Sequence, residues 1–246
     1  MERIPWWALL LVAAGLFVAV GIQRSEVYRE TLDFLASGVL LTLVLTVLSY
    51  ALALVLGLVA GLMRISNNPW ISTPATLYVE VVRGVPLLVL LLYIAFVLTP
   101  ALADATGIGW WRNEIVRGVL GLGIGYGAYL AEVYRAGIES IPRGQREAAL
   151  SLGMSYAQAM RYVILPQALR VVLPALGNDF IALLKDSSLA SVLSVQELTY
   201  SGNLLNARTF RAFETYNMVA LLYLLMTLAG SAGVRLLERV TAGGRG

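Results

Sequence analysis

The chain has 246 residues, of which 59% are hydrophobic and 13% are charged. Charged residues make up about a quarter of an ordinary soluble domain, so this chain has more apolar side chains than a soluble core can bury. Cysteine and histidine are absent, which excludes disulfides, thiolate nucleophiles and the commonest metal ligand and general base. The net charge of +3 is dispersed, whereas a nucleic-acid-binding protein carries a clustered basic face.

Several stretches are long and apolar enough to cross a membrane, because a hydrocarbon core of about 30 Å takes about 20 helical residues. The four uncharged runs are residues 4–23, 38–63, 84–103 and 215–234. Two weaker candidates, residues 118–138 and 173–195, contain both acidic and basic side chains. The runs are continuously apolar rather than alternating, which favours helices over the strands of a β-barrel. The sequence therefore predicts an all-α polytopic membrane protein with about six transmembrane helices.

The first apolar run can be interpreted as a retained membrane helix or as a signal peptide cleaved near Ala19 to Gly21. A retained helix is favoured because Glu2 cancels the charge of Arg3 and because the run is long. With this helix retained, the distribution of arginines predicts that the loop 139–173 and both termini are cytoplasmic. The chain is therefore expected to be a multi-pass protein of the inner (plasma) membrane.

The loop 139–173 is too polar to cross a membrane and too regular to be a flexible linker. Residues 145–152 favour a short helix, and Gly153 suits the left-handed conformation that ends one. Ser155 followed by Gln158 is typical of a capping box, which begins a second helix. From composition alone, these two helices could equally be an amphipathic pair that lies on the membrane surface without a partner.

A motif in this loop resembles the EAA loop of the permease subunits of ABC importers. The family pattern is E-A-A, three residues, G, nine residues and I-x-L-P, and its spacing is kept here with valine in place of isoleucine. The matching residues are Glu147, Ala148, Ala149, Gly153, Leu165 and Pro166. Pro166 is expected to end or kink the second helix, because proline lacks the amide donor. The resemblance implies that Glu147 docks on a cytoplasmic ATPase, and the alternative is that it merely stabilises its own helix.

Three further segments resemble the polar amino acid permeases, the membrane subunits of histidine, arginine and glutamine importers. Residues 80–88 are similar to E-x-x-R-G-T-P-L-L, residues 131–138 to A-E-x-x-R-A-G-I, and residues 177–189 to G-N-[ED]-F…K-[DE]-S-S-L. The resemblance covers about residues 37 to 240 and implies the five-helix core of a type I ABC importer behind an additional N-terminal helix. The implied organisation is an N-terminal helix and outer loop in 1–35, a permease domain with a cytoplasmic coupling-helix loop in 36–240, and a cytoplasmic tail in 241–246.

This resemblance implies a subunit that forms the path for a polar amino acid in an ATP-driven importer. The implied partners are an extracellular binding protein, a second permease subunit of the same or another sequence, and two cytoplasmic subunits that bind ATP and Mg²⁺. No G-x-x-x-x-G-K-[ST] loop is present, so this chain is expected to bind no cofactor or metal and to catalyse no reaction. The glycine-rich run 121–127 favours close helix packing. A second interpretation is an ion-coupled secondary amino acid transporter, which would explain charges inside the membrane but not the EAA loop.

Charged residues inside membrane spans are costly and usually face a polar cavity or a partner. Glu80 and Arg83 are three residues apart, so they lie on one helix face and can pair. Glu132 and Arg135 repeat this spacing near the cytoplasmic end of their span. Each cluster either lines the substrate path or forms an ion pair that holds helices together. The ion pair is favoured for Glu132 and Arg135, and a role in the path is favoured for the other acids.

The candidate substrate site is expected near the bilayer midplane, between the span that contains Glu80 and Arg83 and the span 173–195. Its residues are Glu80, Arg83, Asn178, Asp179, Lys185, Asp186 and Ser187. Both spans contain helix breakers, and broken helices expose backbone groups that a zwitterion can use. The breakers are Gly84, Pro86, Pro174 and Gly177. In this hypothesis Arg83 binds the carboxylate of the amino acid and the acids bind its ammonium group.

Two positions depart from many members of the resembling family. Val85 stands where relatives have threonine, and Leu90 stands where they have glutamine. Both family residues are polar groups that would face the path. Their replacement predicts either a less polar substrate or a heterodimer in which the other permease subunit holds the site.

Overall fold

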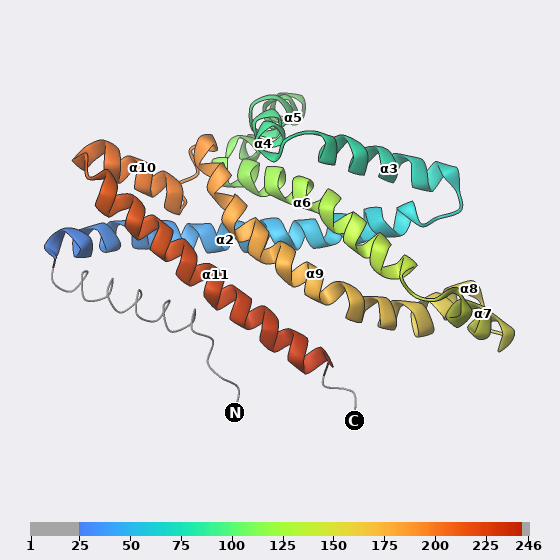
Figure 1. Ribbon diagram of the computed structural model, residues 1–246. Helices are drawn as coiled ribbons and strands as arrows, with labels where there is room; N and C mark the ends of the chain where they lie inside the picture. Colours follow the sequence, from blue (N-terminus) through green and yellow to red (C-terminus); the bar gives the residue numbers. More distant parts are fainter. Residues whose placement is uncertain (1–24, 243–246) are drawn as a thin grey trace, which may run out of the picture.

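The computed structural model describes residues 25–242, in which every regular element is helical (Figure 1). In chain order they are α2 (Glu26–Arg64), α3 (Pro69–Gly84), α4 (Leu87–Tyr93), η1 (Ile94–Leu98), α5 (Thr99–Thr106), η2 (Gly109–Arg112), α6 (Glu114–Glu139), α7 (Arg143–Ser151), α8 (Tyr156–Ala159), η3 (Met160–Ile164), α9 (Leu165–Asp186), η4 (Ser187–Leu193), α10 (Leu198–Thr209) and α11 (Ala212–Ala242). The all-α prediction is confirmed for this part of the chain. The expected helix 4–23 lies outside the described residues.

Four helical segments within the described range are long and apolar enough to cross a membrane. They are Glu26–Arg64, Leu87–Thr106, Tyr156–Leu193 and Ala212–Leu237. α6 runs beside α2 through the middle of the bundle (Figure 1), and its 26 residues also suffice for a crossing. Each predicted span after the first therefore coincides with a helix.

The helix α2 begins at Glu26, well before the uncharged run that starts at Gly38. The outer loop expected up to residue 35 is therefore largely helical. Hydropathy identifies only the part of a helix that lies in hydrocarbon. The part of α2 that lies in water is stabilised by Glu26 in its first turn, because a negative charge is favourable at a helix N-terminus. The first turns of α2 thus project beyond the apolar region of the same helix.

Helix breakers have different effects in the two spans where they were expected. The chain breaks after Gly84, where Val85 is extended with φ −106° and ψ 136°, and α4 begins after Pro86. This break separates α3 from α4 and confirms the prediction for this segment. The prediction is wrong for α9, which continues through Pro174 and Gly177. Membrane helices tolerate such residues, because neighbouring groups can satisfy the freed carbonyl and small residues admit a neighbour.

The outer loop expected after residue 195 contains a helix, α10, whose start is fixed by Glu197. The Glu197 carboxylate accepts hydrogen bonds from the backbone N–H groups of Thr199 at 2.9 Å and Tyr200 at 2.8 Å, and from the Tyr223 hydroxyl of α11 at 2.8 Å. Glu197 is fully buried, and burial raises the pKa of its carboxyl. This cap anchors α10 to α11 at one end of the bundle.

The most extensive helix packing joins α2 to α6, with glycines on both helices. A Cβ atom on Gly57 of α2 would lie 2.6 Å from Cβ of Leu130, and one on Gly123 of α6 would lie 2.6 Å from Cδ2 of Leu52. Real Cβ atoms do not approach so closely, so a side chain at Gly57 would push the helices apart and one at Gly123 would displace the Leu52 side chain. Close packing through small residues therefore accounts for the glycine-rich run of α6, as the sequence predicts.

Candidate functional site: the EAA loop and the polar face of α6

The EAA loop forms a compact helical projection at the end of the bundle opposite α10 (Figure 1). α7 ends in a turn in which Gly153 has φ +81° and its N–H donates to the Leu150 carbonyl at 3.0 Å. The expected capping box starts α8: the Ser155 N–H donates to the Gln158 side chain at 2.8 Å, and the Gln158 N–H donates to the Ser155 hydroxyl at 3.3 Å. Both sequence-predicted turn features are confirmed.

The second helix of the loop does not end at Pro166. A π-helical turn, Met160–Ile164, precedes Pro166, which occupies the first turn of α9. The π turn changes the hydrogen-bond register at the point where proline offers no donor, so the helical path continues from Tyr156 to Leu193. The loop is therefore continuous with a membrane-spanning helix.

Apolar packing fixes the loop to the bundle and leaves its tip exposed. Ile164 and Ala168 pack with Ile138 of α6 and with Ile141, which follows the end of that helix. Ala149 is buried, whereas Glu147 and Ala148 are exposed. The exposed glutamate lies on the same projection as exposed apolar side chains, of which Leu152 is 81% accessible. This surface combines one acid with apolar contacts, which is suited to docking on a groove of another protein.

Glu132 of α6 is the centre of a charged cluster near the EAA loop. Its carboxylate accepts hydrogen bonds from Arg64 of α2 and from Arg135, which also binds Glu139. Arg83 of α3 approaches the same carboxylate, with Nη1 3.8 Å from Oε2. The predicted pair of Glu132 and Arg135 is confirmed, and the cluster joins three helices.

The pair of Glu80 and Arg83 that the spacing allows is not formed. Glu80 faces Arg64, with 3.6 Å between Oε1 and Nη2, while Arg83 faces Glu132. Both side chains of α3 find opposite charges on the neighbouring helices, so the three-residue spacing within α3 does not decide the pairing. Glu80 is largely exposed, and Arg83 is 40% exposed.

A row of aromatic rings continues from this cluster along α6. The Arg83 guanidinium lies 5.7 Å from the Tyr129 ring centroid, and the Tyr129 ring lies 5.9 Å from that of Tyr126. The Tyr126 hydroxyl donates to the Asp186 carboxylate of α9 at 2.8 Å. We call Tyr126, Tyr129 and Glu132 the polar face of α6. The sequence analysis missed both tyrosines, although their three-residue spacing up to Glu132 indicates one helix face.

The other candidate residues of α9 differ in accessibility. Asp179 is partly buried and lies close enough to Tyr50 and Tyr126 to interact electrostatically with both hydroxyls. Asn178 and Lys185 are exposed. Ser187 is fully buried, and its hydroxyl donates to the Leu184 carbonyl at 2.7 Å.

The two spans expected to flank the substrate meet through α4 and η4 rather than through α3 and α9, because Leu91 of α4 and Ala190 of η4 belong to one buried apolar cluster. α3 packs on α2 and α6, whereas α9 packs on α6, α11 and α2 (Figure 1). α6 therefore lies between them, and its polar face connects Arg83 on one side with Asp186 on the other. Within the described chain, no group of three acidic side chains is arranged to hold a metal ion.

Comparison with known proteins identifies the family of this helical arrangement. Residues 53–242 match the family of binding-protein-dependent transport system inner membrane components. The chain belongs to this family. The predicted fold of a type I ABC importer permease and the predicted function as an importer permease are thereby confirmed, and this permease is a multi-pass inner-membrane protein.

Curated relatives align with this permease over most of their own length. The glutamine transport system permease protein GlnP of Escherichia coli is 42% identical over 209 residues, which are 85% of this chain and 93% of the relative. The probable glutamine ABC transporter permease protein GlnM of Bacillus subtilis is 40% identical over 198 residues, 80% of this chain and 88% of the relative.

Solved structures give the same result for the fold. A crystal structure of an amino acid ABC transporter with histidines is 41% identical to this permease, with a TM-score of 0.77 over 86% of this chain and 95% of that one. The inward-facing MetNI methionine ABC transporter is 22% identical and has a TM-score of 0.74 over 88% of this chain and 99% of that one. The latter similarity shows the shared fold.

Proposed function

We propose that this permease imports a polar amino acid of the glutamine class in a complex driven by ATP hydrolysis on partner subunits. The observation that carries the proposal is the 42% identity to a glutamine permease over nearly its whole length. The relatives are transport components rather than enzymes. In this proposal the chain forms the substrate path, and two partner ATPase subunits bind ATP and Mg²⁺.

The geometry of the EAA loop supports the docking of an ATPase. Glu147 is exposed and can accept charge-assisted hydrogen bonds from an arginine or from backbone donors. The loop is fixed to α6 and α9 by the apolar cluster around Ile164, so a force on the loop is transmitted to both helices. In this proposal the EAA loop and both termini are cytoplasmic, and the α10 end faces the extracellular binding protein.

The polar face of α6 supports a substrate path along this helix, completed by a second permease subunit. Arg83 and Asp186 lie at opposite ends of the tyrosine row. In the proposed path Arg83 attracts the carboxylate of the amino acid, and Asp179 and Asp186 attract its ammonium group. Asn178, Lys185 and Glu80 are accessible for further contacts, whereas the buried Ser187 supports the end of α9.

Co-purification and reconstituted transport together test this function. The full chain, expressed in its native membrane and purified by a tag, is expected to bring an ATPase with it in a constant ratio. The assembled complex in proteoliposomes should take up glutamine with ATP inside and not with an ion gradient alone. Uptake by the isolated chain under an ion gradient without ATP would instead support the secondary transporter. Wild-type assembly with uptake of a different amino acid would overturn the substrate assignment alone.

A further inference from the structure

Arg83 is the least satisfied cation of the charged cluster around Glu132. Its Nη1 atom lies 3.8 Å from the Glu132 carboxylate, and within residues 25–242 its guanidinium donates no hydrogen bond. Arg64 and Arg135 instead donate hydrogen bonds to that carboxylate, and each of them also faces a second acid. Arg83 therefore shares its acidic partner with two arginines that bind it more closely.

Arg83 also lies where the charged cluster meets the tyrosine row of α6. Its guanidinium is 5.7 Å from the Tyr129 ring centroid, and both side chains are exposed in part. An arginine that stacks on an aromatic ring keeps the N–H groups at its edge free to donate. These donors match the two oxygens of a carboxylate. The cluster thus holds one guanidinium loosely at the end of the proposed substrate path.

The surroundings of Glu132 allow Arg83 to change its partner at low cost. When Arg83 turns to another carboxylate, Glu132 keeps the hydrogen bonds from Arg64 and Arg135, so its charge stays compensated. The contact that is given up is long and partly exposed, and such ion pairs contribute little to stability. A substrate carboxylate and the Glu132 carboxylate therefore compete for the same guanidinium.

We propose that Glu132 sets the affinity of the path for the carboxylate of the amino acid by competing for Arg83. This inference rests on the proposed function, in which Arg83 binds that carboxylate. In the empty path Arg83 faces Glu132, and the amino acid has to displace this acid in order to bind. When the amino acid leaves, Glu132 pairs with the guanidinium again, which favours release. Glu132 is thus a positioning residue, because it acts through Arg83 and does not contact the substrate.

Equilibrium binding of glutamine tests the competition. The permease is purified with its ATPase partners, without the extracellular binding protein, and titrated with radiolabelled glutamine. Glu132→Gln removes the competing charge, so it should bind glutamine about two- to fivefold more tightly than the wild type. Arg83→Gln should bind it about ten- to a hundredfold more weakly, and adding Glu132→Gln to Arg83→Gln should give no tightening. A purely structural role of Glu132 predicts the opposite sign, because a damaged path binds its substrate less well.

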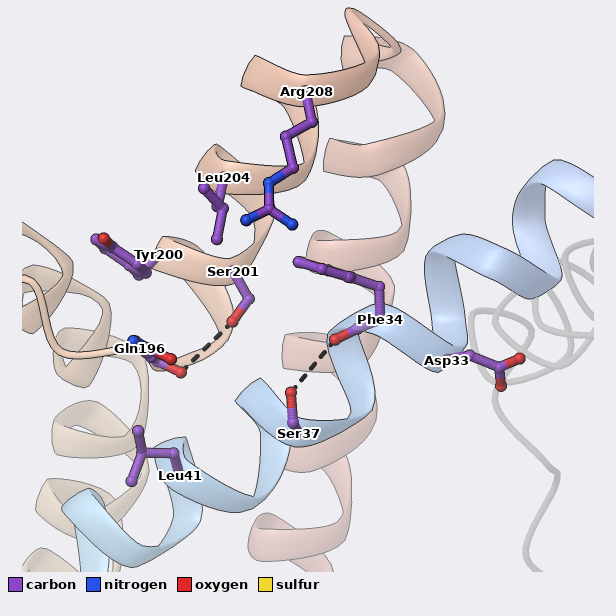
Figure 2. A pocket seen from close by; sticks show the side chains of 9 residues that line it. All are labelled: Asp33, Phe34, Ser37, Leu41, Gln196, Tyr200, Ser201, Leu204 and Arg208. Atoms are coloured by element: carbon purple, nitrogen blue, oxygen red, sulfur yellow. Dashed lines mark hydrogen bonds between the residues drawn. The ribbon is translucent and has the colours of Figure 1, made fainter.

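Two control variants separate this exchange from unspecific effects of charge. Glu139→Gln removes an acid from the same cluster, but one that pairs with Arg135 rather than with Arg83. Arg208→Gln removes another arginine that lies over an aromatic ring, 5.8 Å from the Phe34 centroid, in a separate cavity between α2 and α10 (Figure 2). Both variants should bind glutamine as the wild type does.

The failure of the competition and the failure of the proposed path give different results. If Arg83→Gln weakens binding and Glu132→Gln leaves it unchanged or weaker, the competition is refuted and the path stands. Tightening of the same size in Glu139→Gln would also refute it, because the effect would then come from the net charge of the cluster. Unchanged binding in Arg83→Gln, or no binding of glutamine by any variant, would overturn the proposed carboxylate contact together with this inference.

A second variant keeps the test open if Glu132→Gln does not assemble. Glu132→Asp retains the charge but withdraws the carboxylate from Arg83 by one methylene group. It should therefore also bind glutamine more tightly than the wild type. An affinity no higher than that of the wild type would contradict the proposal.

Discussion

At the scale of single residues, Glu132 has the most consequential environment in the described chain. Its carboxylate is shared by arginines of α2, α3 and α6, and a second carboxylate, that of Glu139, also pairs with Arg135. Removing one charge from a partly buried ionic cluster leaves the opposite charges without compensation. The loss in folding free energy is then larger than the net stabilisation that the intact ion pair provides. Glu132 is therefore expected to matter more for helix assembly than its surface position near a helix end suggests.

The first prediction concerns this carboxylate. Glu132→Gln should lower the free energy of unfolding by about 1.5–3 kcal/mol, because the hydrogen bonds from Arg64 and Arg135 lose their charge. Glu139→Gln is the matched control: Glu139 is 54% exposed, and its pair with Arg135 should contribute less than about 1 kcal/mol. Thermal unfolding in detergent measures both. Equal melting temperatures for Glu132→Gln and the wild type would show that the cluster does not join the helices.

The second prediction concerns the acids beside the tyrosine row. Asp186→Asn keeps a hydrogen-bond acceptor for Tyr126 but loses the negative charge. If Asp186 or Asp179 binds the ammonium group, Asp186→Asn or Asp179→Asn should raise the substrate concentration for half-maximal ATP hydrolysis about ten- to a hundredfold in the reconstituted transporter. Glu80→Gln tests the same role on α3. Asp104→Asn, which changes an exposed acid paired with Arg112, should have no effect.

Assembly distinguishes this prediction from a purely structural role. Acids that only hold helices together should reduce the yield of complex while the surviving complex keeps its normal substrate dependence. Normal assembly and normal substrate dependence in Asp179→Asn, Asp186→Asn and Glu80→Gln would refute the proposed path. The substrate would then be bound by the partner permease, as the replacements at Val85 and Leu90 allow.

At the scale of secondary-structure elements, local signals predicted the features that depend on local chemistry. The cap at Gly153, the capping box at Ser155 and the break at Pro86 depend on the residue types at those positions, so they can be predicted from the sequence. The continuity of α9 through Pro174 does not, because it depends on packing around the freed carbonyl. The start of α10 likewise depends on a buried glutamate whose third partner, Tyr223, is distant in sequence.

The third prediction concerns the EAA loop as an element. Glu147→Ala should uncouple substrate transport from ATP hydrolysis without lowering the melting temperature, because the Glu147 side chain is exposed. Gly153→Leu should uncouple through the turn instead, since φ +81° strains any residue with a Cβ atom. Gly144→Ala is a control in the same loop, because a Cβ atom there meets open space. ATP-driven uptake at the wild-type rate in Glu147→Ala and Gly153→Leu would exclude the loop as the coupling element.

At the scale of the whole molecule, hydropathy predicted the spans after the first, each of which is helical, but not which of them are neighbours. Hydropathy is a property of each segment, whereas the position of α6 between α3 and α9 depends on how glycines of α2 and α6 fit against each other. The tyrosines of α6 connect α3 with α9, whereas the spans to which these two helices belong meet at α4 and η4. The two ends of the bundle are also chemically distinct, with the EAA loop at one end and α10 at the other (Figure 1).

The last prediction concerns the direction in which this bundle crosses the membrane. The proposed function requires the EAA loop in the cytoplasm, where the ATPases bind, and α10 on the opposite side. Because the chain contains no cysteine, a single introduced cysteine reports its own location without any background. Leu152 in the EAA loop is 81% exposed, and Arg211 beyond α10 is exposed as well, so both positions accept a reagent. In intact cells, a membrane-impermeant maleimide should label Arg211→Cys and not Leu152→Cys, and permeabilisation should allow labelling of both. Labelling of Leu152→Cys alone in intact cells would reverse the orientation and with it the assignment of the EAA loop to ATPase docking.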